Sequence, residues 1–242
     1  MEHLALRFSE VPGVVAVALG GSRATGRARP DSDWDFGLYY RDTIDPADVR
    51  ALGFEGEVFG PGEWGRVVNG GAWLVIDGQR VDLIYRDLDQ VEEWTRDAQR
   101  GRFRVYREVG YVAGVPTYVA PAELALQRVL IGSLPTPEFP DVLRETAPLW
   151  WRRVVTGALK FAAAHALRDD AVGCAGNLAV AALGEAHARL CEAGSWYLPE
   201  KELLAQAGLD DVQPTLRALG ADLPAAVDRV RDALGDVDHR PR

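Results

Sequence analysis

Two aspartates separated by a single residue point to divalent-cation chemistry near the N-terminus. They are Asp33 and Asp35, at the head of the largely apolar run 36–40. In an extended segment, side chains at positions i and i+2 share a face, so the two carboxylates would lie side by side. Mg²⁺ prefers oxygen ligands and commonly takes one or two protein carboxylates together with substrate phosphates. The pair therefore predicts a Mg²⁺ site.

A glycine turn shortly before this pair could hold the phosphates. Gly20, Gly21 and Ser22 follow the apolar run 14–19, which we expect to be a strand. Glycine leaves room for a close backbone approach, and the N–H groups of such a turn, with a hydroxyl, can hold phosphate oxygens. Taken alone, each motif could be an ordinary turn or a solvated strand end. Together they indicate transfer at a nucleoside triphosphate.

A third carboxylate, Asp82, lies in the β-type run 80–85 with apolar residues on both sides. A charged group facing a protein core would be costly, whereas a metal site would accommodate it. The dipeptide Asp77-Gly78 between two apolar runs is the strongest short hairpin signal in the chain. We therefore expect Asp82 in the middle of a hairpin strand, beside the strand that carries the Asp33 and Asp35 pair.

These motifs resemble, in their order, the signature of the polymerase-β-type nucleotidyltransferase superfamily. The resemblance rests on the Gly-Gly-Ser turn at 20–22, on Asp33 and Asp35, and on Asp82, and it covers roughly the first half of the chain. It implies a small mixed sheet flanked by helices, two Mg²⁺ ions, and transfer of a nucleoside monophosphate with release of pyrophosphate. By this resemblance Asp33 and Asp35 bind metal, and Asp82 completes the metal site or serves as the general base.

The elements that must position these residues change in character near residues 116–121. Short β-type runs come first, and a helical period follows Pro121. We expect an α/β fold of the α+β kind, with a small mixed β-sheet nucleotidyltransferase domain at 1–119 and an α-helical bundle domain at 120–242. The stretch 132–140 is expected to be a loop. The expected helices span about 46–52, 87–99, 122–130, 149–167, 170–193, 199–208 and 223–234.

This domain order resembles the small-molecule branch of the superfamily, notably the aminoglycoside nucleotidyltransferases. The segment 177–201 is similar to the spectinomycin/streptomycin adenylyltransferases. The resemblance implies that Lys201 reaches the nucleotide phosphates, with Lys160 as a rival and an exposed helix-start lysine as the alternative interpretation of Lys201. The candidate nucleotide-binding residues are Gly21, Ser22, Ser32 and Lys201.

The charge balance bears on the partners of the protein. The formal net charge is -9, and Lys160 and Lys201 are the only lysines. Proteins that grip nucleic acid usually carry a basic face, so stable nucleic-acid binding is not expected, and an acidic surface favours a cationic small acceptor. Arg23, Arg27 and Arg29 cluster near the expected phosphate site, either as triphosphate contacts or as a solvated loop.

Composition sets the broad class. With 242 residues and 48% hydrophobic content, the chain is long enough for substantial cores. Cys174 and Cys191 fall in one expected helix, too far apart for a disulfide, and are expected to be small buried residues. The start of the chain lacks a signal-peptide pattern and no run has membrane-spanning length. We expect a cytoplasmic protein with no membrane association.

Together these features predict Mg²⁺-dependent transfer of a nucleoside monophosphate, with ATP and AMP as the first choice. The expected acceptor is a hydroxyl of a small molecule such as an aminoglycoside-like antibiotic, which would make the protein an antibiotic-resistance enzyme. One alternative is a relative that nucleotidylates tRNA or protein, as in toxin–antitoxin systems. Another is a catalytically silent binding module, against which the three intact aspartates argue. The nucleotide, the acceptor and the oligomeric state remain open at this stage.

Overall fold

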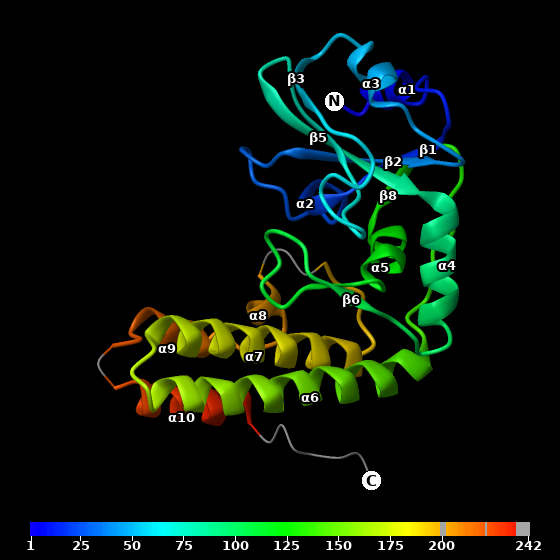
Figure 1. Cartoon of the computed structure of the whole chain (residues 1–242). Coiled ribbons are helices and arrows are strands. Elements are labelled where there is room, and N and C mark those ends of the chain that lie inside the picture. Colours follow the sequence, from blue (N-terminus) through cyan, green and yellow to red (C-terminus); the bar gives the residue numbers. More distant parts are fainter. Residues whose placement is uncertain (199–201, 221, 236–242) are drawn as a thin grey trace. The chain divides into compact units, whose positions relative to one another are not determined.

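The computed structural model describes residues 1–198, 202–220 and 222–235 (Figure 1). Lys201, one of the candidate phosphate ligands, lies outside these residues. The chain divides into two compact units, which exchange short segments between residues 99 and 116. The sheet unit contains residues 1–98, 103–109 and 116–138, and the helical unit contains residues 99–102, 110–115 and the chain from 139 onward.

The sheet unit is built on a six-stranded mixed sheet in the order β3-β4-β5-β2-β1-β8. Only β2 and β5 pair in parallel; the other neighbours are antiparallel. This confirms the expected small mixed sheet. The strands are β1 (Val14–Leu19), β2 (Trp34–Tyr40), β3 (Glu55–Val58), β4 (Gly71–Ile76), β5 (Gln79–Asp87) and β8 (Arg128–Ile131), and a separate two-stranded sheet pairs β6 (Val105–Tyr106) with β7 (Val115–Pro116).

The predicted hairpin is present. Strands β4 and β5 pair from Gly71 opposite Ile84 to Ile76 opposite Gln79, so that only two residues form the turn. Asp77 and Gly78 have φ of +52° and +74°. Positive φ at both central residues is the requirement of a type I′ turn, whose twist matches that of the flanking strands. The turn fixes the register of β5, and with it the position of Asp82.

One face of the sheet carries the hydrophobic core of the sheet unit. Phe36 and Leu83 are fully buried there, and Phe8 of α1 and Val49 of α3 pack with them. Helices α1 and α3 lie on one side of the sheet, and α2 and α5 on the other (Figure 1). The helices of this unit are α1 (Leu4–Phe8), α2 (Gly21–Ala24), α3 (Pro46–Arg50), α4 (Leu88–Ala98) and α5 (Val119–Leu126).

An ion pair anchors α5 to the second face of the sheet. Arg86 of β5 is buried and donates from Nε and Nη2 to the carboxylate of Glu123, at 2.5 and 2.6 Å. On the same face, the Tyr39 hydroxyl donates to Oε1 of Gln127 at 2.8 Å. Helix α5 therefore covers the end of this face at which β2 and β5 finish.

The helical unit is centred on two long helices that pack side by side, with α10 against both (Figure 1). The Asp170 carboxylate accepts a hydrogen bond from the Gly173 N–H at 2.9 Å and begins α7, as predicted. Gly194, with φ of +66°, follows its end. The helices are α6 (Asp141–Ala166), α7 (Ala171–Glu192), α8 (Leu203–Gln206), α9 (Val212–Arg217) and α10 (Leu223–Leu234).

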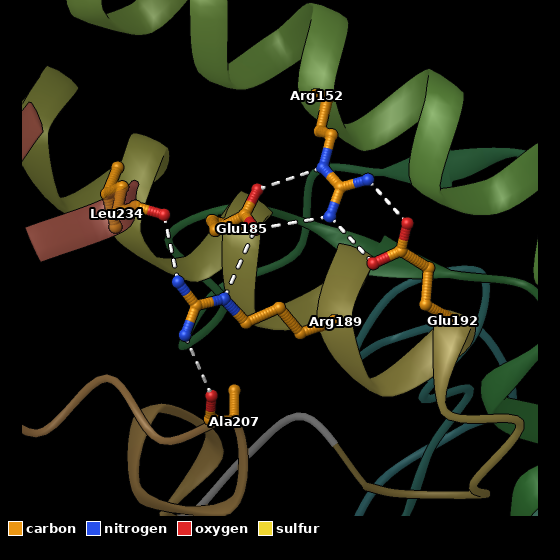
Figure 2. Close-up of polar contacts among 6 residues, drawn as sticks. All are labelled: Arg152, Glu185, Arg189, Glu192, Ala207 and Leu234. Carbon is orange, nitrogen blue, oxygen red and sulfur yellow. Dashed lines mark hydrogen bonds and ion pairs between the residues drawn. The ribbon is translucent and has the colours of Figure 1, made fainter. Parts of the chain in front are cut away.

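A buried carboxylate joins several segments of this unit (Figure 2). Glu185 of α7 accepts from Arg152 of α6 at 3.4 Å and from Arg189 of α7 at 3.2 Å. Arg189 also donates to the carbonyls of Leu234 at 2.8 Å and Ala207 at 3.4 Å. Glu185 thus pairs with two guanidinium groups. Through them, α7 is linked to α6, to the end of α10 and to the residue after α8.

Two helix boundaries expected from the sequence are wrong. The helix expected at 122–130 begins earlier and ends at Leu126, and residues 128–131 form β8 at the sheet edge beside β1. The helix expected to start after Pro148 starts at Asp141, so Pro148 lies inside α6. Proline suits a first helical position, but Pro148 lies several residues after the start of α6 and is buried in the protein.

Both cysteines are buried thiols, as expected for small core residues. Cys174 and Cys191 belong to α7. Across the parts of the chain that the structure describes, none of the helices combines the length and the apolar character needed to cross a membrane.

Candidate active site

Asp35 and Asp82 lie directly opposite each other on neighbouring strands. In the parallel pair of β2 and β5, Asp35 is in register with Asp82, and the next pair is Phe36 with Leu83. Because Phe36 and Leu83 are buried in the core, both carboxylates belong to the opposite face of the sheet. Neighbouring strands are about 4.8 Å apart, so two of the predicted acids come together.

Asp33 is held at the edge of the same face. It precedes β2, two residues before Asp35, and its Oδ1 lies 2.6 Å from Nε of Arg80. That oxygen is buried and accepts no hydrogen bond within the described residues, so the contact is an ion pair without hydrogen-bond geometry. Arg80 also donates to the carbonyl of Asp31 at 3.3 Å. Sequence reasoning missed Arg80, because its approach to Asp33 depends on the strand register.

The glycine turn closes tightly onto Asp35. The Gly20 N–H donates to the carbonyl of Asp35 at 2.8 Å. Gly21 has φ of +59°, and a Cβ at this position would lie 1.9 Å from Oδ2 of Asp35. Any side chain at residue 21 would therefore be strained and would displace the carboxylate. The turn that was expected to approach phosphate is also shaped around this acid.

Arg23 fastens the loop that leads into β2. Its guanidinium donates from Nε to the carbonyl of Asp33 at 3.0 Å and from Nη2 to that of Ser32 at 2.5 Å, and lies 4.2 Å from the Trp34 ring centroid. The Ser32 hydroxyl accepts from the Arg29 N–H at 2.9 Å. Of the arginines near the expected phosphate site, Arg23 positions the Asp-Trp-Asp segment.

Comparison with known proteins finds a similarity for the first 99 of the 242 residues. Residues 1–99 match the family model described as "Nucleotidyltransferase domain". The glycine turn and all three carboxylates fall inside the match. These 99 residues are therefore similar to nucleotidyltransferase domains. This match supports nucleotidyltransferase activity for the protein.

One solved structure with similarity to this chain is a nucleotidyltransferase-like protein from Exiguobacterium sibiricum. The identity is 12% and the TM-score 0.43, over 96% of this chain and 72% of that one. No curated protein matches the sequence.

The donor set on this face of the sheet suits a hard divalent cation. Asp35 and Asp82 are adjacent, and the buried Oδ1 of Asp33 has acceptor capacity that no hydrogen bond uses within the described chain. Among the described residues, no three His, Cys, Asp or Glu side chains converge as a complete metal-binding group. Mg²⁺ normally completes its coordination with water and substrate phosphates, so an incomplete protein set still fits it.

The predicted contacts of Ser22 and Lys160 with the nucleotide phosphates stay predictions. Ser22 lies in α2, directly after Gly21. Lys160, the rival of Lys201, is exposed on α6 in the helical unit.

Proposed function

We propose that the protein transfers a nucleoside monophosphate, AMP from ATP, to a hydroxyl group of a small molecule. The observation that carries the proposal is the register of Asp35 with Asp82, on the sheet face next to the Gly20-Gly21 turn. The net charge of -9 supports a small acceptor in preference to nucleic acid. An aminoglycoside-like antibiotic is the candidate acceptor, and antibiotic resistance in the cytoplasm is the proposed role.

The residues divide the work of such a transfer. Backbone N–H groups of Gly20 and Gly21, with the Ser22 hydroxyl, would hold phosphate oxygens at the turn. The acceptor oxygen attacks the α-phosphorus, the bond from this phosphorus to the bridging oxygen breaks, and pyrophosphate leaves. When bound by the three aspartates, Mg²⁺ would lower the pKa of the acceptor hydroxyl and neutralise charge on the leaving group.

The proton of the acceptor hydroxyl needs a base in the same place. Asp82 is mid-strand and beside Asp35, where a carboxylate can take that proton or can serve as a further metal ligand. The variant Asp82→Asn separates the two roles. Retained binding of Mg²⁺-ATP with loss of transfer would identify the base, and loss of binding would identify a ligand.

The decisive test is a screen for transfer of radiolabel from α-³²P-labelled ATP, GTP, CTP and UTP. The acceptors are aminoglycosides, lincosamides and bulk tRNA, each with wild type and Asp35→Asn. We expect label in a small product that needs Mg²⁺, and a loss of about 1,000-fold or more in the variant, because charge neutralisation carries most of the catalysis. Asp31→Asn, an exposed carboxylate of the same loop, is the matched control and should retain activity. Label in tRNA, or equal activity of wild type and Asp35→Asn, would overturn the proposal.

A further inference from the structure

The row of side chains that contains Asp35 and Asp82 continues across the hairpin to the edge of the sheet. Trp73 of β4 is in register with Asp82, and Glu57 of β3 is in register with Trp73. Residues in register share a face, so the row reads Glu57, Trp73, Asp82, Asp35 across four strands. At its other end, the Gly20 N–H binds the carbonyl of Asp35. The acids therefore stand between the glycine turn and an aromatic residue.

A second row lies beside the first. Val75 of β4 is in register with Glu55 on one side and with Arg80 on the other. Val75 is 46% exposed and Trp73 is 51% exposed, although both are large apolar residues within the sheet. Glu55 and Glu57 are exposed as well, and neither has an ion-pair partner in the part of the chain that the structure describes. This edge thus combines apolar surface with two uncompensated negative charges.

Two other aromatic rings hold the exposed Trp73 ring in place. It stacks on Trp64 with centroids 5.2 Å apart and an interplanar angle of 17°, and it meets Phe59 edge-on at 4.8 Å. Trp64 is itself tightly packed against the backbone of β4, because a Cβ on Gly71 would lie 2.9 Å from the Trp64 ring. A large ring that two other rings hold in place offers a rigid apolar platform at little entropic cost.

Gly56 keeps the two glutamates at this edge. It separates Glu55 from Glu57, has φ of +144°, and a Cβ on it would lie 2.1 Å from the Trp73 carbonyl oxygen. The strand can follow β4 only because this residue lacks a side chain. The backbone of β3 is therefore adapted to place both glutamates beside the platform.

We infer that Trp73 and Glu57 form the acceptor subsite and that the acceptor is a cationic, hydroxyl-bearing small molecule. This inference rests on the proposed function. Since the glycine turn would hold the triphosphate on the β1 side of the acids, the acceptor approaches from the β4 and β3 side. An indole face and an exposed carboxylate together attract a cationic group. Glu57 is two strands from Asp82, about 10 Å, which is a reach that one small molecule can span.

Binding can be measured without catalysis. Calorimetry with the full chain, in the absence of nucleotide and Mg²⁺, uses streptomycin and kanamycin as cationic probes and maltotriose as a neutral hydroxyl-bearing probe. We expect the cationic probes to bind more tightly than maltotriose. Trp73→Ala should raise their Kd about tenfold and Glu57→Gln about threefold, in keeping with cation–π and surface charge contributions. Trp73→Phe, which keeps an aromatic platform, should lose less than Trp73→Ala.

Controls separate the subsite from the reaction. Glu10→Gln makes the same charge change at an exposed position after α1 and should leave the Kd of every probe within about twofold. Affinity for Mg²⁺ with a non-hydrolysable ATP analogue, which tests the proposed function, should be unchanged in Trp73→Ala. If neither cationic probe binds wild type, or if Trp73→Ala and Glu57→Gln bind the probes as wild type does, the inference is overturned. Weakened nucleotide binding by Trp73→Ala would also overturn the inference, because the Trp73 ring would then contact the nucleobase of the donor triphosphate.

Discussion

At the scale of single residues, the helical unit contains a histidine that stays uncharged. His187 is buried, stacks on Trp151 at 4.1 Å between ring centroids, and has Nδ1 2.6 Å from the Tyr197 hydroxyl oxygen. Burial lowers the pKa of His187 to about 3, because the imidazolium would lose its hydration. The folded protein therefore binds no proton here between pH 6.5 and about 3, whereas the unfolded chain does.

This difference predicts a stability that falls as the pH is lowered. Below about pH 6.5 the unfolded state gains a proton that the folded state refuses, so the free energy of unfolding drops by at most about 1.4 kcal/mol per pH unit. Urea unfolding of wild type and His187→Gln at pH 7.5, 6.0 and 5.0 measures the slopes. We expect a shallower slope in the variant, with His3→Gln, an exposed position, matching wild type. Parallel slopes for wild type and His187→Gln would contradict the prediction.

The same scale shows what the sequence can reveal about the site. Asp35 could be placed on a strand face from a two-residue alternation, and Asp82 in a hairpin strand from one turn signal, because both are local patterns. The contact of Arg80 with Asp33 and the alignment of Trp73 with Asp82 arise from pairing between strands. Which side chains become neighbours there depends on the register, which no single segment encodes.

At the scale of elements, a helix-capping aspartate and a hairpin turn signal correctly predicted where a helix begins and how two strands are joined. Asp170 begins α7 and the Asp77-Gly78 turn joins β4 to β5, as expected. The run 128–131 has an apolar pattern that is compatible with a helix or a strand, and its pairing with β1 decides for the strand. Pro148 predicts a helix start, but it lies inside α6, where it is buried.

The turn between β1 and α2 allows a controlled test of element geometry. Gly21 and Gly26 both have left-handed φ, +59° and +72°, so alanine strains either by about 1 kcal/mol. A Cβ at Gly21 would meet Asp35, whereas nothing lies within 4 Å of one at Gly26. We expect Gly21→Ala to lower nucleotidyl transfer about 100-fold or more, with thermal unfolding shifted by only a few degrees.

Gly26→Ala is the control for backbone strain alone. Its melting temperature should move as far as that of Gly21→Ala, while its transfer rate stays within about threefold of wild type. Equal losses of activity in the two variants would show that strain in the turn, and not the displaced carboxylate, limits the reaction.

At the scale of the whole molecule, the two units are held together internally by different means. The sheet unit combines an apolar face packed under α1 and α3 with a buried ion pair, Arg86 with Glu123. In the helical unit, one buried carboxylate, Glu185, pairs with two arginines. Glu185 is only 3% exposed and faces two arginines (Figure 2). A buried carboxylate with two cationic partners is costly to remove, because Arg189 then loses its carboxylate partner and Arg152 keeps only Glu192.

Glu185→Ala should therefore destabilise the helical unit by about 3–5 kcal/mol. Glu192→Ala is the matched control, since Glu192 contacts only Arg152 in this network, at 2.5 and 2.7 Å, and is about half exposed; its loss should cost at most about 1 kcal/mol. Urea unfolding followed by far-ultraviolet circular dichroism, which weights the long helices, measures both. Because Arg152 retains Glu185 when Glu192 is removed, a loss in Glu192→Ala equal to that in Glu185→Ala would mean that burial of Glu185 contributes nothing special to this unit.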